Sequence, residues 1–305
     1  MWRWQRGECD SIGESGFYSP GTAGASICRL DRNLPNEHLK KMVTFIKLGG
    51  SLITEKSKAF TARREMISRL AAEIKQALQE VPDLRIVLGH GSGSFGHTAA
   101  KQYNTHLGVH TAHEWHGFIK VRRQADALHR LVMDELWDAG LEAISFPPSA
   151  SVVASDHHSF KMEINPLQQA LEHHLIPVVF GDVVFDQRIG GTILSTEEIL
   201  SYLCNVISFE QIIIAGIEQG VWKDARNPRE VYTVITPSLL AELGDDLGGS
   251  KAPDVTGGMR SKVEILFSIL ASYPGIEIQI ISGLIEGNLL RALRGEQVGT
   301  HLKQA

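Results

Sequence analysis

Hydrophobic residues along the chain gather in short, nearly continuous runs that alternate with longer segments of helical periodicity. The runs are five or six residues long and rich in β-branched side chains, which is typical of strands buried on both faces of a parallel sheet. Between the first two runs, apolar residues recur every three or four positions from Ile67 to Leu78, which predicts an amphipathic helix. The predicted strands are residues 43–48, 84–89, 142–146, 176–181, 211–216 and 277–282.

This alternation predicts an α/β fold with an open, mainly parallel sheet between two layers of helices. Ligands of such sheets bind beyond the carboxyl ends of the strands, so the turns that follow the strands are candidate sites. A second helical stripe runs from Met259 to Leu270. Two β-like runs within residues 183–194, around Gly190 and Gly191, predict a hairpin appended to the sheet.

Composition narrows the class of protein. The chain has 305 residues, of which 43% are hydrophobic and 21% charged, as in an ordinary globular protein. A net charge of -5 gives no basic footprint for nucleic acid, and a local Lys/Arg cluster at 120–130 is interpreted as the solvent face of a helix. No apolar run approaches the ~20 residues that span a membrane. Three scattered cysteines, Cys9, Cys28 and Cys204, form no disulfide framework, which favours a cytoplasmic protein.

The first 41 residues differ from the rest of the chain. They contain Gly, Ser and Pro without sustained periodicity, and they lack the apolar stretch of a secretory signal. Met42 stands directly before the first predicted strand. Two interpretations stay open for residues 1–41: a disordered N-terminal extension, or the choice of an upstream start codon.

Three glycine-containing turns stand where phosphates commonly bind. Lys47-Leu48-Gly49-Gly50-Ser51 follows the first strand, residues 89–97 follow the second, and residues 254–262 open the second helix. Glycine leaves backbone N–H groups uncovered by a Cβ, as in the nests and helix N-termini that bind oxyanions. For one turn alone, a tight connection between two elements explains the glycines equally well. Three such turns in one chain favour phosphate binding.

The second turn also has the GxGxxG spacing of a dinucleotide site, at residues 91–96. A dinucleotide fold places this sequence after its first strand, so its position after the second strand argues against that function. Six of the thirteen histidines lie between His90 and His116, but no HExxH motif occurs, and a transition-metal site is not favoured. His97 is the exception, because an imidazole beside a helix N-terminus can donate a hydrogen bond to phosphate, or can cap the helix.

Four segments, in this order, resemble isopentenyl phosphate kinases of the amino acid kinase superfamily: FIKLGGSLITEK, GHGSGSFGH, VFGDV and DVTGGMRSK. The resemblance runs from about Met42 to the C-terminus. It implies an amino acid kinase-like, three-layer αβα sandwich over residues 42–305, with an acceptor lobe of about 42–187 and an ATP lobe of about 188–305. It further implies transfer of the γ-phosphoryl group of ATP to isopentenyl phosphate, with Mg2+, by a homodimer.

The resemblance also implies roles for individual residues. The implied ATP-binding residues are Lys47, Gly49, Gly50, Ser51, Gly93, Gly258 and Lys262, and the implied substrate-binding residues are Ser92, His97, Gly181 and Asp182. The implied catalytic residues are Lys47, Lys56, His97, Lys262 and Glu198. Lysines and Mg2+ suit phosphoryl transfer, because two polyanions must be brought together. A phosphate monoester, with a second pKa near ~6, is already an oxyanion at neutral pH, so no general base is needed.

Two segments depart from the family pattern. Residues 195–198 read S-T-E-E instead of S-G-D-D. Glu198 is the favoured candidate for the carboxylate that organises the metal or a lysine, and Glu197 is the second choice. The alternative is that these residues only cap the N-terminus of a helix. Residues 217–219 lack the usual acidic and hydroxyl side chains on the nucleotide side. Residues 244–253 are expected to form a mobile flap, in which Lys251 either reaches a phosphate or stays solvated.

Two alternative functions stay open from the sequence. One is a kinase for another small phosphate, phosphonate or carboxylate, of the fosfomycin or N-acetylglutamate type. The other is a non-catalytic protein that binds or stores oxyanions on the same fold, which the altered turns favour and the retained lysines oppose. An isoprenoid tail needs an apolar pocket, and the candidates by position, each with ordinary core as its alternative, are Phe118, Val121, Leu128 and Ile144.

Overall fold

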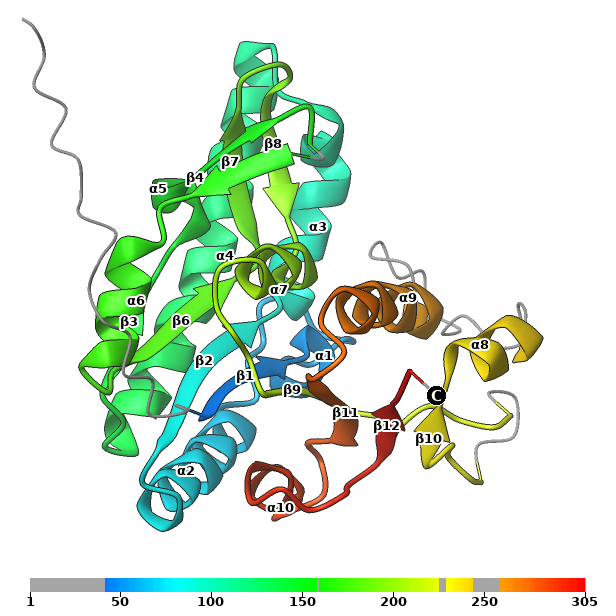
Figure 1. Cartoon of the computed structure of the whole chain (residues 1–305). Coiled ribbons are helices and arrows are strands. Elements are labelled where there is room, and N and C mark those ends of the chain that lie inside the picture. The colour runs from blue at the N-terminus through cyan, green and yellow to red at the C-terminus, as the bar shows by residue number, and fades with distance from the viewer. Residues whose placement is uncertain (1–41, 158, 225–228, 244–257, 305) are drawn as a thin grey trace, which may run out of the picture. The chain divides into compact units, whose positions relative to one another are not determined.

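The six predicted strands all lie in one eight-stranded sheet (Figure 1). The computed structural model describes residues 42–157, 159–224, 229–243 and 258–304. The predictions for 1–41 and 244–253, and residues 254–257 of the third glycine turn, therefore lie outside the described residues. Paired strands of this sheet run parallel, except that β11 and β12 are antiparallel. Its order is β10 (Val234–Ile235), β12 (Thr300–Leu302), β11 (Glu277–Ser282), β9 (Gln211–Gly216), β1 (Met42–Leu48), β2 (Leu84–His90), β6 (Ile176–Phe180) and β3 (Ala143–Ser145).

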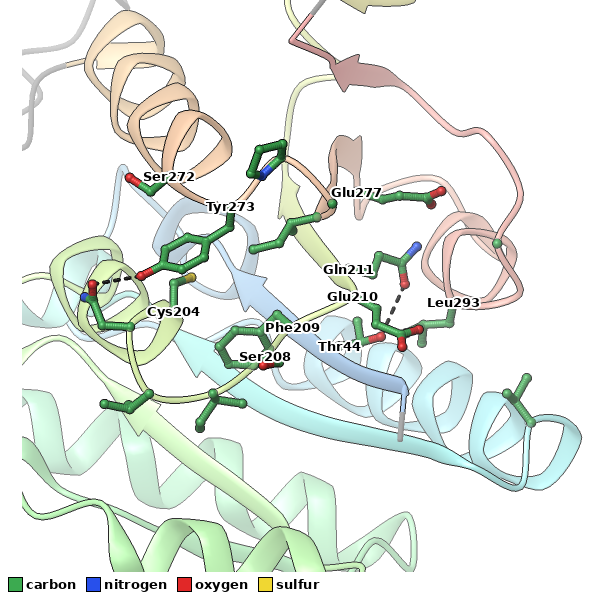
Figure 2. Close-up of a pocket in the computed structure, with 18 of the residues that line it drawn as sticks. Thr44, Cys204, Ser208, Phe209, Glu210, Gln211, Ser272, Tyr273, Glu277 and Leu293 are labelled. Atoms are coloured by element: carbon green, nitrogen blue, oxygen red, sulfur yellow. Dashed lines mark hydrogen bonds between the residues drawn. The ribbon is translucent and has the colours of Figure 1, made fainter. Parts of the chain in front are cut away.

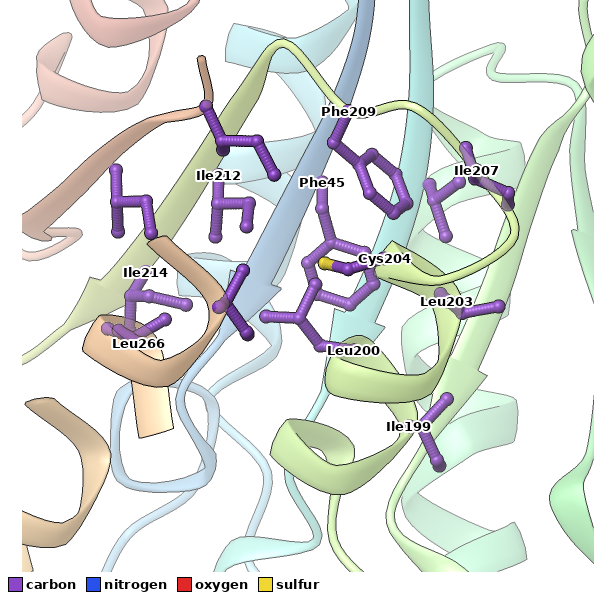
Figure 3. Packing of buried hydrophobic residues seen from close by; sticks show 14 of the residues in the cluster. Phe45, Ile199, Leu200, Leu203, Cys204, Ile207, Phe209, Ile212, Ile214 and Leu266 are labelled. Carbon is purple, nitrogen blue, oxygen red and sulfur yellow. The ribbon is translucent and has the colours of Figure 1, made fainter. Parts of the chain in front are cut away.

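Helices cover both faces of this sheet, because its strands are apolar on both faces. Successive strand residues point to opposite faces, and in β1 Phe45 lies in one hydrophobic core while Ile46 lies in the other. The core of Ile46 contains residues of α2 (Arg64–Glu80), α4 (Ala112–Asp138) and α10 (Asn288–Leu293). The core of Phe45, seen in Figure 3, contains residues of α6 (Asn165–Glu172), α7 (Thr196–Cys204) and α9 (Gly258–Ser272). The predicted αβα sandwich is therefore confirmed.

The helix α2 shows how the hydrophobic pattern builds these cores. Ile67, Leu70 and Ile74 have no more than 1% exposure, whereas Ser68 and Gln76 on the other side are exposed. Complete burial of one such large apolar side chain stabilises the fold by ~1.5–3 kcal/mol. The remaining described helices are α1 (Gly50–Ile53), α3 (Gly93–Tyr103), α5 (Pro148–Ser151), α8 (Pro237–Leu243) and the 3-10 turn Thr105–Leu107. Within the described residues, no helix combines the length and apolar character needed to cross a membrane.

Four short strands form a second sheet, which the sequence predicts only in part. Its order is β5 (Ser159–Met162), β4 (Val152–Ser155), β7 (Asp182–Asp186) and β8 (Gly190–Leu194). The carboxylate of Asp186 ties the two hairpins together, because it accepts backbone N–H groups from residues 156–157 in one turn and 188–189 in the other. The predicted hairpin is thus half of a separate sheet rather than an addition to the main one.

The pairing of β7 with β8 also corrects one detail of the prediction, the position of the hairpin turn. The strands pair antiparallel from Asp182 with Leu194 to Asp186 with Gly190, so the turn consists of residues 187–189 instead of the glycine pair. The expected lobe boundary at 187–188 falls inside this turn.

Candidate active site

Two glycine turns are in direct contact at the carboxyl ends of β1 and β2. A Cβ on Gly50 would lie 2.4 Å from the backbone N of Gly93, so this approach requires glycine at position 50. Gly93 has a φ of +48°, a left-handed conformation that glycine adopts without steric penalty. Thr54 joins the turns, because its Oγ1 donates to Gly50 O at 2.7 Å and accepts from Ser94 N at 3.0 Å. The two turns therefore form one structure.

The first turn is also attached to β9, on the other side of β1. Gly49 N donates to the carbonyl of Ala215 at 2.8 Å. Helix α1 begins at the next residue, and its Ser51 is partly exposed. The ends of three neighbouring parallel strands therefore meet here, at the edge of the sheet where such folds bind ligands.

The second turn is itself the beginning of a helix. Helix α3 starts at Gly93, four residues before His97, with Ser92 as the N-cap residue. His97 therefore lies in the second turn of α3 and not at its start as predicted, and its side chain is outside the description. Two early amides are already paired: Ser94 N with a threonine hydroxyl, and Phe95 N with the Ser92 carbonyl at 3.0 Å.

A largely buried ion pair stands beside the first turn. Lys47, the last residue but one of β1, donates to the carboxylate of Glu197 in the first turn of α7. Burial raises the pKa of Glu197, but the charge and hydrogen bond of Lys47, together with the charge of Lys262 on α9, outweigh burial and hold this pKa below its usual range. Elements β1 and α7 thus bring a cation and an anion into contact, and the charge of Lys262 on α9 acts on the same carboxylate, so both lysines that the resemblance assigned to ATP act on Glu197.

Glu198, the predicted organising carboxylate, has a different position. Its carboxylate accepts from the N–H and from the hydroxyl of Ser195, each at 2.7 Å, and Ser195 Oγ accepts from Glu198 N at 3.1 Å. This reciprocal pattern is a capping box, which the sequence analysis named as the alternative. The contact with Lys47 belongs instead to Glu197, the second choice from the sequence.

Asp182, a predicted substrate-binding residue, is buried instead of lining a surface. Its side chain is 0% exposed, accepts from Ser149 N at 3.2 Å and lies 3.5 Å from Nε of Arg122. Burial raises its pKa, against the charge of Arg122 and the hydrogen bonds. Gly181 N donates to the carbonyl of His90 at 3.3 Å and so supports the second glycine turn. Asp182 therefore organises its neighbours and is too deeply buried for the expected contact with substrate.

Arg122 is the partner that the sequence analysis missed. It was assigned to a solvent face of a helix, yet its side chain is only 24% exposed. Its Nε donates to Ser149 Oγ at 2.8 Å, and its guanidinium group lies 5.7 Å from the centre of the Phe180 ring. A signal was present in the helical period, because Arg122 lies among positions of α4 that are buried: Phe118, Val121, Ala125 and Leu128.

The remaining predicted residues are placed less informatively. Lys56 is exposed in the loop after α1, and Gly258 is the first residue of α9. Of the four apolar candidates for the isoprenoid pocket, Leu128 lies in the core of Ile46, and Ile144 is 40% exposed on the edge strand β3. Phe118 and Val121 alone lie together, in a small cluster whose other buried members are Ala99, Tyr103, Val109 and Val183.

A hollow of about 870 Å³ lies at the opposite end of the strands (Figure 2). Its lining includes Thr44, Gln211 and Glu277, which stand at or near the beginnings of β1, β9 and β11. It also includes Cys204, whose thiol has its pKa raised to about 12 by burial and is therefore unreactive. Because the glycine turns and the paired lysine lie at the carboxyl ends, this hollow is not the candidate active site.

Comparison with known proteins agrees with this geometry. The amino acid kinase family matches residues 42–282. An isopentenyl phosphate kinase of Methanothermobacter thermautotrophicus is 32% identical over 267 residues, 84% of this chain and 97% of that protein. One of Methanocaldococcus jannaschii is 29% identical over 270 residues, 86% of this chain and 98% of that protein. An X-ray structure of isopentenyl phosphate kinase superposes with a TM-score of 0.68 and 28% identity, covering 85% of this chain and 99% of its own. The chain belongs to the amino acid kinase family and, within it, to the isopentenyl phosphate kinases.

Proposed function

We propose that this protein transfers the γ-phosphoryl group of ATP to isopentenyl phosphate, forming isopentenyl diphosphate and ADP. The observation that carries this proposal is the buried ion pair of Lys47 and Glu197, on which the charge of Lys262 also acts, beside two interlocked glycine turns. Relatives that match over nearly their whole length carry the name of this activity. The same relatives favour a phosphate acceptor over the phosphonate and carboxylate alternatives, and an enzyme over a storage protein.

The main task of the site is electrostatic. Two unit charges of the same sign 4 Å apart repel by on the order of 4 kcal/mol at an effective dielectric constant of about 20, and both substrates are polyanions. Lys47 and Lys262 oppose this repulsion, and Lys47 is already held in place by Glu197. A donor that is fixed before the substrate arrives costs little reorganisation during the reaction.

The chemistry then needs alignment more than proton transfer. An ionised oxygen of the acceptor phosphate attacks the γ-phosphorus of ATP, and the bond from that phosphorus to the bridging oxygen of ADP breaks. We assign the acceptor phosphate to the second turn, with Ser92 and His97, and the ATP phosphates to the first turn and the start of α9. The exposed Lys56 is assigned to the transferring group. The further ATP-side residues in this assignment are Gly49, Gly50, Ser51, Gly93 and Gly258.

Magnesium fits this site only as a partner of the nucleotide. Within the described residues no group of three His, Cys, Asp or Glu side chains is placed to hold a metal ion, and the carboxylate of Glu197 already accepts from Lys47. Mg2+ commonly keeps several waters and binds one or two carboxylates together with substrate phosphates. We propose that Mg2+ is bound mainly by the phosphate oxygens of ATP, where it neutralises their charge.

A cytoplasmic homodimer completes the proposal. The scattered cysteines support a reducing compartment, and Cys204 is buried with a raised pKa, so it takes no part in disulfide exchange. The dimer follows from the family resemblance. Sedimentation of the purified protein tests it, and a single species with the mass of one chain would contradict it.

Purified protein with ATP, Mg2+ and isopentenyl phosphate tests the function. We expect two coupled diphosphate signals in the 31P spectrum, and none with isopentenol, a phosphonate or N-acetylglutamate as acceptor. Lys47→Met should reduce kcat by on the order of 100-fold, as removal of a transition-state donor does. Lys58→Met is the matched control, because this lysine is 69% exposed and pairs with a nearby surface glutamate. Turnover of another acceptor without isopentenyl diphosphate would refute the proposal.

A further inference from the structure

Two buried histidines connect the second glycine turn to the neighbouring strands. His90, the last residue of β2, is 1% exposed, and its ring is stacked with those of Phe180 and His129. Its Nε2 lies 3.0 Å from Nδ1 of His129, whose Nε2 lies 2.6 Å from the hydroxyl of Ser145 at the end of β3. Nδ1 of His90 lies 3.2 Å from the carbonyl oxygen of Gly91, the first residue of the turn.

The Gly91 carbonyl determines the direction of each hydrogen bond that joins Gly91, His90, His129 and Ser145. A carbonyl oxygen only accepts, so Nδ1 of His90 carries a proton. Burial lowers the pKa of His90 to about 4, and burial together with nearby cations lowers that of His129 to about 2, so each ring is neutral near pH 7 with one proton. Nε2 of His90 therefore accepts from Nδ1–H of His129, and Nε2 of His129 accepts from the Ser145 hydroxyl.

Further hydrogen bonds fix the peptide group that precedes Gly91, while the His90 ring holds the carbonyl of the peptide group that follows it. The carbonyl of His90 accepts from Thr196 Oγ1 at 2.7 Å, and Gly91 N donates to the carbonyl of Leu48 at 3.1 Å. In a trans peptide the C=O and the N–H point in opposite directions. The His90 ring that holds the Gly91 carbonyl therefore also directs the N–H of Ser92 away from itself.

We propose that His90 is a positioning residue for the acceptor phosphate: its Nδ1–H holds the Gly91 carbonyl and so keeps the Ser92 amide presented as a donor. This inference rests on the proposed function, in which the second turn binds the acceptor. If the peptide group between Gly91 and Ser92 were inverted, its carbonyl oxygen would stand where the phosphate needs an N–H donor, and this oxygen would repel the phosphate. Ser145 acts one step further away, because its hydroxyl fixes the tautomer of His129.

A purely structural role explains the histidines less well. An apolar ring in place of His90 would fill the same stack against Phe180, without the cost of burying polar nitrogen atoms. The polar chain adds a hydrogen-bond donor of defined direction at the first peptide of the turn. That direction is the property the proposed function requires.

Two substitutions of His90 separate direction from packing. Asn places its amide near the position of Nδ1 and can still donate to Gly91, whereas Gln reaches the position of Nε2 and leaves the Gly91 carbonyl without its donor. Both remove the ring stack. We expect His90→Gln to raise the KM for isopentenyl phosphate about tenfold, the effect of one lost hydrogen bond in this setting. His90→Asn should stay within about threefold of wild type, and the KM for ATP should change little in either variant.

A second pair keeps the test decisive where the His90 variants fail to fold. Ser145→Ala removes the donor that fixes the tautomer and should raise the acceptor KM about threefold, and Ser145→Thr, which keeps the hydroxyl, should restore it. Equal increases for both members of either pair, or a parallel rise in the KM for ATP, would overturn the proposal.

A spectroscopic measurement separates this inference from the proposed function. In 15N spectra of the wild-type protein without substrates, Nδ1 of His90 should be protonated and Nε2 unprotonated, and the reverse pattern would overturn the hydrogen-bond chain. A wild-type protein with the expected tautomers that makes no isopentenyl diphosphate would refute the proposed function and leave the chain of hydrogen bonds standing. Formation of isopentenyl diphosphate by a protein in which Nε2 of His90 carries the proton would refute the hydrogen-bond chain and leave the proposed function standing.

Discussion

Glu197→Gln is the substitution that tests the electrostatic centre of the site. The side chains of Lys47 and Glu197 are only 7% and 14% exposed, so water screens their charges weakly. Glutamine keeps the length of the side chain but removes the negative charge that acts on both Lys47 and Lys262. Breaking a buried ion pair by removing one partner costs ~3–5 kcal/mol, and the hydrogen bond that Gln can still accept places our expectation near the lower value.

Urea unfolding with and without ATP measures this effect. Without ATP, we expect Glu197→Gln to lower the free energy of unfolding by about 3 kcal/mol. Because the phosphates of ATP supply negative charge at the same lysines, ATP should stabilise the variant more than the wild type. The kcat should fall at least tenfold, by our order-of-magnitude expectation for a lysine that is no longer held in place.

Glu198→Gln is the matched control one residue away. Glutamine at this position can still complete the capping box, so the variant loses only a negative charge near the helix N-terminus, which costs ~0.3–1 kcal/mol, and this loss should not depend on ATP. If Glu197→Gln cost no more than this control and ATP protected both variants equally, the ion pair would be a local structural contact, and the assignment of Lys47 to the nucleotide would be wrong.

Three further predictions follow from the described residues. Gly93→Ala should cost more than ~2 kcal/mol in chemical denaturation, because its φ is +48° and the new Cβ would lie 2.1 Å from a threonine oxygen, whereas Gly275→Ala, with nothing within 4 Å, should cost little. The pKa of His90 is about 4 in the folded protein against 6.5 in the unfolded chain, so as the pH falls the unfolded chain binds the proton first. About 3 kcal/mol of stability that is present above pH 6.5 should therefore be lost as the pH falls to 4. The free energy of unfolding of His90→Phe should depend less on pH, and parallel profiles for the variant and the wild type would contradict the lowered pKa. Arg122→Met should destabilise by about 3 kcal/mol by leaving Asp182 buried without its cation, and Asp182→Asn in the same chain should restore part of the loss; no recovery in thermal unfolding would argue against the pair.

Six strands of the main sheet and the first two glycine turns were predictable because their signals are local. A strand buried on both faces must be apolar at nearly every position, so its sequence shows a continuous run wherever it pairs. The turns show themselves by glycine, because few other residues tolerate contacts as close as that between Gly50 and Gly93. The contact itself was not predictable, since it joins residues more than forty positions apart in the sequence.

That Lys47 pairs with Glu197 and not with Glu198 was predictable from the sequence. The pattern S-x-x-E marks a capping box and assigns the second glutamate to its own helix N-terminus. Consecutive helical residues point about 100° apart, so the first glutamate cannot share that direction and is left to meet Lys47. The family resemblance indicated that a carboxylate at this turn is important, whereas helix geometry decides which of the two carboxylates can contact Lys47.

The hydrogen-bond chain from His90 could not be found from sequence. It joins the end of β2 to the middle of α4 and the end of β3, and its members are separated by 39 and 16 positions. The histidines between 90 and 116 attracted attention as a group, yet the partner of His90 is His129, outside that group. Buried polar contacts of this kind depend on tertiary packing, which leaves no periodic pattern in the chain.

In the proposed function, with the acceptor at the second glycine turn and the nucleotide at Lys47, the first turn of α7 would hold the two substrates in register. Thr196 holds the carbonyl of His90 at 2.7 Å, next to the acceptor turn, while the adjacent Glu197 holds Lys47 on the nucleotide side. Glu198 fixes the start of the same helix through Ser195. Because these are consecutive residues of one rigid element, a displacement of α7 would move the acceptor turn and the nucleotide lysine together. If the proposed assignment of the two substrates is right, one capped helix would control the distance between two mutually repelling anions, which would not depend on the separate positions of two loops.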